Sequence, residues 1–322
     1  MDRRRFITSA SAAASLMGFV PGAMANISRE IDPPHLEKRS LGRTGEKLSL
    51  IGFGGVVVWG ATPQQADEWV GRAVDTGVNY FDVAPSYGNA ETMLGPALRP
   101  YRKKVFLACK TLGRTREESR KELENSLKTL QTDHFDLYQF HAVNTKKDVD
   151  TIFSKGGAME TFLEARKEGK IRYIGFSSHT VEASLAMMER FDFDTILFPV
   201  NFAMWYAGNF GPQVLQRAQE KEMGILALKA MARGPYPEGT KKKIPKCWYE
   251  PLDTPEEASM GLRFTLSHAV TAAIPPGNPD LFAMVLTLAA KFRPMTPEEI
   301  DEVKKEGLAT TPIFRYPSED YA

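Results

Sequence analysis

Short apolar runs alternate with amphipathic segments eight times between residues 50 and 290, and this alternation restricts the possible folds more than any other feature of the chain. The apolar runs, which we expect to form buried strands, are 50–54, 78–82, 104–110, 135–140, 171–177, 195–200, 224–230 and 271–274. The amphipathic segments, which we expect to form helices, are 63–76, 90–98, 115–130, 157–168, 180–189, 212–222, 255–268 and 279–290. Eight strand–helix units predict an α/β fold, a (β/α)8 TIM barrel.

A doubly wound parallel sheet is the alternative arrangement of the same elements. Such a sheet normally carries a G-x-G-x-x-G fingerprint after its first strand, where the backbone approaches a dinucleotide. Gly52, Gly54 and Gly55 occur in and after the first apolar run without that spacing. The barrel is therefore the preferred prediction. Ahead of it, alternating residues on both sides of Thr44-Gly45 predict a β-hairpin.

The composition is that of an ordinary globular protein, with 322 residues, 43% hydrophobic and 25% charged. A formal net charge of +1 gives no broad basic field of the kind that binds nucleic acid. We expect residues 38–322 to form one barrel domain, with a helix near 297–306 in a short C-terminal extension, and residues 26–37 to form a linker. No extra interface is visible in the sequence, so we expect a monomer.

The first 25 residues have the order of a secretory signal peptide. R-R-R-F-I at 3–7 precedes a mild Ala/Ser-rich apolar stretch, and A-M-A at 23–25 provides small residues for cleavage. The adjacent arginines indicate export by the twin-arginine machinery to the periplasm or another exported location, with cleavage after Ala25. A disordered basic terminus is the alternative. No other segment is apolar and long enough to anchor the chain in a membrane.

Four polar side chains lie at or just after the carboxyl ends of three successive predicted strands. Asp82 and Tyr87 belong to N-Y-F-D-V-A-P-S-Y-G, Lys110 to V-F-L-A-C-K-T and His141 to D-L-Y-Q-F-H. In a parallel barrel these ends converge on one rim, where barrel enzymes have their active sites. We therefore expect the four side chains to form one catalytic group.

These four groups fit the proton chemistry of carbonyl reduction. Tyr87 supplies a proton, although a free phenol has a pKa of about 10. The ammonium of Lys110 favours the phenolate, and the carboxylate of Asp82 keeps that ammonium charged in a dry cleft. A neutral His141 donates a hydrogen bond that positions the carbonyl oxygen. Each residue taken alone also has an ordinary structural interpretation, such as a helix cap, a strand end or a core side chain.

The chain resembles the aldo-keto reductase family from about Lys38 to about Leu288. The resemblance is carried by K-R-x-L-G-x-T-G, D-T-G-V-N-Y-F-D-V-A-P-S-Y-G, S-L-x-x-L-x-x-D-x-x-D-L-Y-Q-F-H, K-I-R-Y-I-G-F-S-S and G-I-L-A-L-K-A-M-A-R-G. It implies a (β/α)8 barrel that binds NADP or NAD along the carboxyl rim without a Rossmann motif. It also implies that the four side chains are the catalytic tetrad, with Tyr87 as the proton donor.

The residues expected to bind the cofactor depart from the usual pattern of the family. Ser177-Ser178 stands where Ser-Asn commonly holds the nicotinamide amide, and a hydroxyl can still make one such hydrogen bond. Asn201 is the amide nearest to the usual glutamine of strand six. On strand seven Leu228-Lys229 replaces the common Tyr-Ser, which removes an aromatic face and adds an ammonium that can bind phosphate.

The eighth unit, A-I-P-P-G-N-P-D, lacks the Lys and Arg with which the family often grips the 2′-phosphate of NADP. Backbone N–H groups after Gly277, at Asn278, can still meet a phosphate at a helix start. Asp280 disfavours an additional phosphate, so NAD is slightly preferred over NADP. Gly54 and Gly55, after the first strand, complete the set of cofactor-binding candidates.

Three tryptophans lie in predicted rim loops: Trp59, Trp205 and Trp248. Aromatic planes at a barrel mouth suit sugar rings or aromatic carbonyl compounds, although such residues equally pack loops against a barrel. No His, Cys, Asp or Glu cluster has metal-ligand spacing, so no metal is expected. Cys109 is expected in the core, and Cys247 as a free thiol in a loop.

The main hypothesis is an exported oxidoreductase that interconverts an aldehyde or ketone with an alcohol by nicotinamide hydride transfer, with a sugar-related carbonyl compound as the preferred substrate. One alternative is an isomerase or epimerase that retains its NAD(P) and returns the hydride within one site. The other is a non-catalytic barrel that binds nucleotide.

Overall fold

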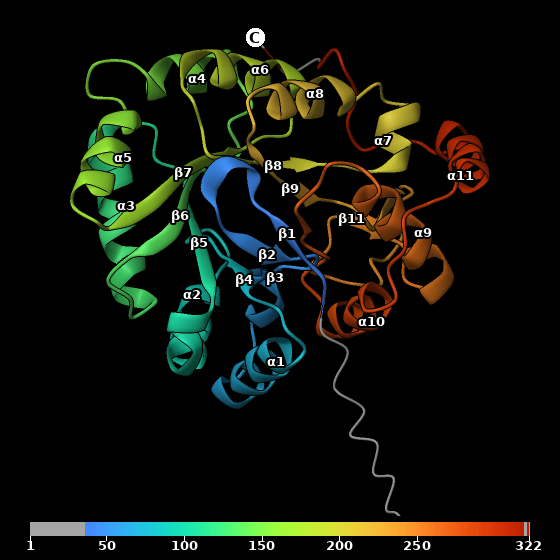
Figure 1. Ribbon diagram of the computed structural model, residues 1–322, viewed down its shortest axis with the longest axis horizontal. Helices are drawn as coiled ribbons and strands as arrows, with labels where there is room; N and C mark the ends of the chain where they lie inside the picture. The colour runs from blue at the N-terminus through green and yellow to red at the C-terminus, as the bar shows by residue number, and fades with distance from the viewer. Residues whose placement is uncertain (1–35, 319–320, 322) are drawn as a thin grey trace, which may run out of the picture. The chain divides into compact units, whose positions relative to one another are not determined.

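The computed structural model describes residues 36–318 and 321. The predicted signal peptide at 1–25 and residues 26–35 of the predicted linker lie outside the described residues. Figure 1 shows a ring of strands enclosed by helices, which is the predicted (β/α)8 barrel. In the described part of the chain, no helix is long and apolar enough to span a membrane.

Eight parallel strands form the barrel wall, in the order β12-β9-β8-β7-β6-β5-β4-β3. Their bounds are β3 (Phe53–Gly54), β4 (Tyr80–Asp82), β5 (Phe106–Thr111), β6 (Phe135–Phe140), β7 (Ile171–Ser177), β8 (Thr195–Pro199), β9 (Gly224–Leu228) and β12 (Ala272–Ala273). A parallel bridge between Ile51 and Ala273 joins the first strand to the last. The backbone N–H of Gly52 donates to the carbonyl of Ala273 at 3.0 Å, so the sheet closes on itself.

The eight helices predicted between the strands are confirmed, and their ends agree with the prediction to within two residues. They are α1 (Pro63–Asp75), α2 (Ala90–Leu98), α3 (Arg116–Thr129), α5 (Ala158–Lys167), α6 (Val181–Arg190), α8 (Pro212–Glu220), α9 (Pro255–Leu266) and α10 (Pro279–Ala289). Thr115 and Glu118 form a reciprocal capping box at the start of α3. Thr254 accepts from the backbone N–H of Glu257 and begins α9.

A small apolar cluster fills the barrel interior, and the N-terminal hairpin closes its lower end. The hairpin consists of β1 (Lys38–Ser40) and β2 (Lys47–Ser49), joined through the short 3-10 helix η1 (Gly42–Thr44). Its Leu41 and Leu48 are fully buried against Tyr80 and Leu137 from the barrel strands. In Figure 1 the hairpin lies across the centre of the barrel. The opposite end, where the strands finish, remains available for chemistry.

Several elements were not predicted because they are too short for a periodic pattern. They are the 3-10 helices η2 (Gly55–Val58) and η3 (Arg99–Lys104), the helices α4 (Lys146–Ile152) and α7 (Phe202–Tyr206), and the hairpin of β10 (Ala232–Pro235) and β11 (Tyr249–Pro251). The predicted C-terminal helix is present as α11 (Pro297–Ala309) and packs on the outside against α7 and α9. The tail beyond it returns to the rim, where the Phe314 ring lies 5.8 Å from the Trp248 ring.

Candidate functional site

The four predicted catalytic residues lie together at the carboxyl rim of the barrel. Asp82 is the last residue of β4, Lys110 is next to last in β5, and His141 directly follows β6. Tyr87 lies in the loop between β4 and α2. Because β4, β5 and β6 are adjacent parallel strands, their ends bring these side chains into one cleft of about 260 Å³.

A buried ion pair forms the base of this cleft. The ammonium of Lys110 donates to the carboxylate of Asp82, and the two residues are 1% and 2% exposed. The same ammonium donates to the hydroxyl of Tyr87 at 3.2 Å. Burial lowers the pKa of Lys110, but Asp82 and Tyr87 outweigh burial and raise it above its ordinary value. The lysine therefore remains charged next to the phenol.

Two further side chains hold the carboxylate of Asp82 in place. The hydroxyl of Tyr80 donates to it at 3.2 Å, and the side-chain amide of Gln139 donates at 3.0 Å. Both residues are fully buried. Sequence reasoning missed them because they sit inside apolar strands, where only the strand register shows that their side chains point inward. They act through Asp82 and are positioning residues.

The phenol and the imidazole face each other across the cleft. The rings of Tyr87 and His141 are 5.7 Å apart and nearly perpendicular. Burial raises the pKa of Tyr87 and the Lys110 ammonium opposes this rise, so the phenol is protonated at neutral pH. Burial, helped by the positive charge of Lys110, lowers the pKa of His141 to about 2. The imidazole is therefore neutral, and its Nδ1 lies 3.5 Å from the hydroxyl of Ser86.

Five of the nine predicted cofactor residues line the same cleft: Gly54, Ser177, Leu228, Lys229 and Gly277. The hydroxyl of Ser177 accepts from the backbone N–H of Ala142 at 2.9 Å, which leaves its own proton available as a donor.

The other four predicted cofactor residues are not among the lining side chains. Ser178 is fully buried and exchanges hydrogen bonds with the backbone of Thr180. Asn201 begins α7, and Asn278 begins α10 by accepting from a backbone N–H at 2.9 Å. Gly55 begins η2, where an added Cβ would lie 2.7 Å from Val83. These four residues therefore have structural roles in this conformation.

Of the three predicted substrate tryptophans, Trp248 lines the cleft. Trp205 instead packs against Phe264 and His268, with ring centroids 6.1 and 4.3 Å apart. Trp59 is 42% exposed outside the lining, and its backbone carbonyl accepts from the ammonium of Lys246.

Among the cleft-lining residues that were not predicted to belong to the site, four have polar or ionisable side chains: His179, Lys246, Cys247 and Tyr249. Three of them lie in the segment that connects β10 to β11 or at its end. The sequence placed this loop at the barrel mouth through Trp248, but it did not show which other side chains of the loop face the cleft. His179 follows β7 directly, a position that is itself a usable signal. Burial and the nearby charge of Lys229 lower the pKa of His179 to about 3. Cys247 is a free, buried thiol.

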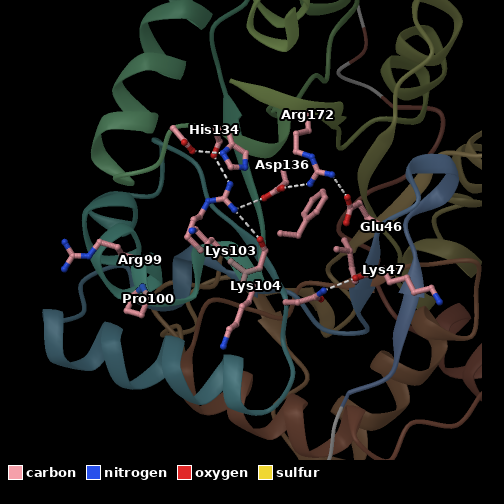
Figure 2. A pocket seen from close by; sticks show the side chains of 15 residues that line it. Glu46, Lys47, Arg99, Pro100, Lys103, Lys104, His134, Asp136 and Arg172 are labelled. Atoms are coloured by element: carbon pink, nitrogen blue, oxygen red, sulfur yellow. Dashed lines mark hydrogen bonds and ion pairs between the residues drawn. The ribbon is translucent and has the colours of Figure 1, made fainter. Parts of the chain in front are cut away.

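A larger hollow of about 790 Å³ lies at the other end of the barrel and has a structural role (Figure 2). Its central charge is Asp136, which is 4% exposed and accepts from Arg102 at 3.0 Å and from Arg172 at 2.7 Å. The side chain of Lys47 points away from Asp136 and Arg172 in Figure 2. Paired charges at the amino ends of barrel strands contribute to stability. Within the described ranges, no group of three or more His, Cys, Asp or Glu side chains could hold a metal ion.

A closed parallel barrel with a Tyr–Lys–Asp–His group at its carboxyl rim defines a class of oxidoreductase. The sequence profile of the Aldo/keto reductase family matches residues 50–274, and the chain belongs to this family. It is 32% identical over 218 residues to Aldo-keto reductase YhdN of Bacillus subtilis (strain 168), which covers 62% of this chain and 63% of that protein.

A second relative is L-galactose dehydrogenase of Arabidopsis thaliana, 26% identical over 215 residues that cover 62% of this chain and 66% of that protein. Both alignments span less than two thirds of the relative's length. Among solved structures, the holo form of aldo-keto reductase AKR11C1 from Bacillus halodurans shares the fold, with a TM-score of 0.69. That match has 24% identity and covers 88% of this chain and 99% of the other.

Proposed function

We propose that this chain interconverts an aldehyde or ketone with an alcohol, with Tyr87 as the proton donor. The observation that carries the proposal is the continuous contact from Asp82 through Lys110 to the Tyr87 hydroxyl, beside a neutral His141. A bound nicotinamide would supply or accept the hydride at the carbonyl carbon. The side chains of this cleft then have to manage one proton and one developing negative charge on the carbonyl oxygen.

Each of the four groups has a distinct part in this proton transfer. Tyr87 holds its proton at neutral pH and releases it to the oxygen as negative charge develops there. The Lys110 ammonium, 3.2 Å away, stabilises the resulting phenolate. Asp82 keeps that ammonium charged. Since the Nδ1 atom of His141 faces Ser86, its Nε2–H is the group left to orient the carbonyl oxygen.

The residues present fit a nicotinamide cofactor, mainly through backbone and small groups. Ser177 would hold the carboxamide, and Leu228 would present an apolar surface to the ring. At Gly277 the backbone lies so close to η2 that an added Cβ would be 2.2 Å from Val56, so only glycine allows this approach at the rim. We propose NAD rather than NADP, because Asp280 is the charged residue in the first turn of α10.

We further propose a sugar-related carbonyl compound as the substrate. The relative named L-galactose dehydrogenase and the aromatic plane of Trp248 in the cleft support this choice.

We also propose that the protein is exported through the twin-arginine machinery as a folded monomer, with its cofactor already bound. Mass spectrometry of the small molecules released on denaturing the protein from its native compartment tests whether the cofactor is retained, and stoichiometric NAD would support retention. Exported protein that still carries the predicted signal peptide at 1–25 would contradict the proposed export with cleavage.

Tyr87→Phe tests the proposed reaction. The variant removes the proton donor and leaves the ring, so kcat/KM for aldehyde reduction should fall by about 10²–10⁴-fold. Nucleotide affinity, measured by fluorescence titration, should stay unchanged. Tyr101→Phe is the matched control, because Tyr101 lies on η3 outside the cleft lining. Unchanged turnover in Tyr87→Phe would refute the proposed role.

A further inference from the structure

The backbone of Lys229 has an unusual conformation, which the surrounding residues hold in place. It follows β9 with a φ of 63°, in the left-handed region that is uncommon for residues other than glycine. Two donors hold its carbonyl group, the backbone N–H of Ala232 at 2.9 Å and the side-chain amide of Asn201 at 3.3 Å. The same amide donates to the carbonyl of Ala232 at 2.8 Å. The turn is therefore built to place this lysine in the cleft.

The ammonium of Lys229 lies against two aromatic faces and has no ionic partner among the described residues. It is 5.0 Å from the ring centroid of Trp248 and 4.8 Å from that of Tyr249. Across residues 36–318, no carboxylate forms an ion pair with it and no acceptor takes a hydrogen bond from it. Aromatic faces stabilise a cation without occupying its N–H donors. Those donors therefore remain available to a ligand.

The cleft as a whole carries an excess of positive charge. Asp82 is the sole acidic residue among the described residues that line it, and it is already paired with Lys110. Lys246, also in the lining, donates to three backbone carbonyls at the end of η2 and is satisfied there. The charge of Lys229 lies close enough to lower the pKa of both His141 and His179. A cation without a counter-charge among the described residues thus lines the same cleft as Tyr87 and His141, where the reacting carbonyl is proposed to bind.

We propose that the substrate of this cleft carries a carboxylate as well as its carbonyl group, and that Lys229 binds this carboxylate. The assignment rests on the proposed function for the role of Tyr87 and His141. A carboxylate bound here would complete the ion pair that the folded chain leaves open, and charge-assisted hydrogen bonds of this kind are among the stronger ones. The aromatic faces of Trp248 and Tyr249 would fix the direction of approach. Lys229 is then a specificity-determining residue.

Matched pairs of aldehydes test the proposal. Each pair consists of an aldehyde acid and its methyl ester: 4-oxobutanoate, 5-oxopentanoate and 4-formylbenzoate, which differ in the distance between the two groups. For at least one pair, we expect the wild type to prefer the acid in kcat/KM. Lys229→Met should reduce that preference by about 10- to 100-fold, mainly through the KM of the acid, and leave the ester nearly unchanged.

Two other variants separate charge from packing. Lys229→Arg keeps the cation and should retain most of the preference for the acid. Lys246→Met removes the other half-buried cation that lines the cleft, and should change acid and ester equally. An acid-to-ester ratio that is unchanged in Lys229→Met would overturn the proposal. A rise in the KM of the nicotinamide cofactor in Lys229→Met with every aldehyde would also overturn the proposal, because Lys229 would then bind the phosphates of the cofactor.

A binding measurement keeps this test independent of turnover. Calorimetric titration with 4-(hydroxymethyl)benzoate and with its methyl ester should show that wild type binds the acid more tightly, and that Lys229→Met loses this difference. If no aldehyde is reduced by the wild type, the proposed reaction fails, but the titration still decides whether the carboxylate site exists. Equal affinity for acid and ester in the wild type would show that it does not.

Discussion

Removing one charge of the Lys110–Asp82 ion pair should destabilise the protein more than removing both. Asp82→Asn leaves the ammonium of Lys110, which is 1% exposed, without a counter-charge. The amide oxygen of the asparagine can still accept from Tyr80 and Gln139, so the loss isolates the charge. Breaking a buried pair in this way costs about 3–5 kcal/mol in the free energy of unfolding.

The double variant Asp82→Asn/Lys110→Met removes the buried charge altogether. We expect it to lose less stability than either single variant, and at least about 2 kcal/mol less than the two single losses added together, because the unpaired ammonium and the unpaired carboxylate are both absent. Urea denaturation followed by circular dichroism measures the four free energies. The exposed pair Lys146–Asp150, with side chains 66% and 50% exposed, supplies the control: Asp150→Asn should leave the free energy of unfolding nearly unchanged.

The result that would refute this reasoning is additivity. If the double variant loses the sum of the two single losses to within about 0.5 kcal/mol, the two charges do not stabilise each other. A loss below about 1 kcal/mol in Asp82→Asn would also refute it, because the ammonium would then become neutral or hydrated at little cost once Asp82, the main cause of its raised pKa, is gone.

Two further predictions concern the rim. Asn201→Ala removes the N-cap of α7 and leaves the carbonyls of Lys229 and Ala232 without their side-chain donor. We expect urea denaturation to show a loss of about 2–4 kcal/mol in the free energy of unfolding. A loss under about 1 kcal/mol would contradict this role. Acid should also destabilise the fold: His141 and His179 have folded pKa values of about 2 and 3, below the unfolded value near 6.5. The unfolded chain therefore binds protons that the folded chain does not as pH falls below 6.5, and each histidine lowers the free energy of unfolding by up to about 1.4 kcal/mol per pH unit. His179→Gln should reduce the slope between pH 6.5 and 5, and an unchanged slope in urea midpoints would contradict it.

The barrel and the position of the four catalytic candidates were accessible from the sequence, for a simple physical reason. A buried parallel strand must be a short apolar run, so its end is visible where polar residues resume. Asp82, Lys110 and His141 stand at such ends, and adjacent strands in a barrel bring their ends together. Nothing beyond strand order is needed to place them in one cleft.

The remaining site residues depend on information that a linear pattern does not contain. Tyr80 and Gln139 lie within the strands, and only the inward or outward direction of each side chain makes them partners of Asp82. Tyr249 and Lys246 reach the cleft because the segment between β10 and β11 turns back over the rim. Trp205 was predicted at the mouth from its loop position, yet the short helix α7 directs it onto Phe264.

The two departures from the family pattern on strands six and seven are coupled in the structure. In the sequence, Asn201 was the amide nearest to the cofactor-binding glutamine that the family usually has on strand six. Lys229 stands where the family commonly has a serine. In the fold, the amide of Asn201 donates to the carbonyl of Lys229 and thereby holds the left-handed turn. A serine at position 229 would need the same turn but would not fill the space against Trp248 and Tyr249. The asparagine and the lysine therefore form one unit, which gives up direct contact of Asn201 with the cleft and in return places a cation in the cleft that His141 also lines.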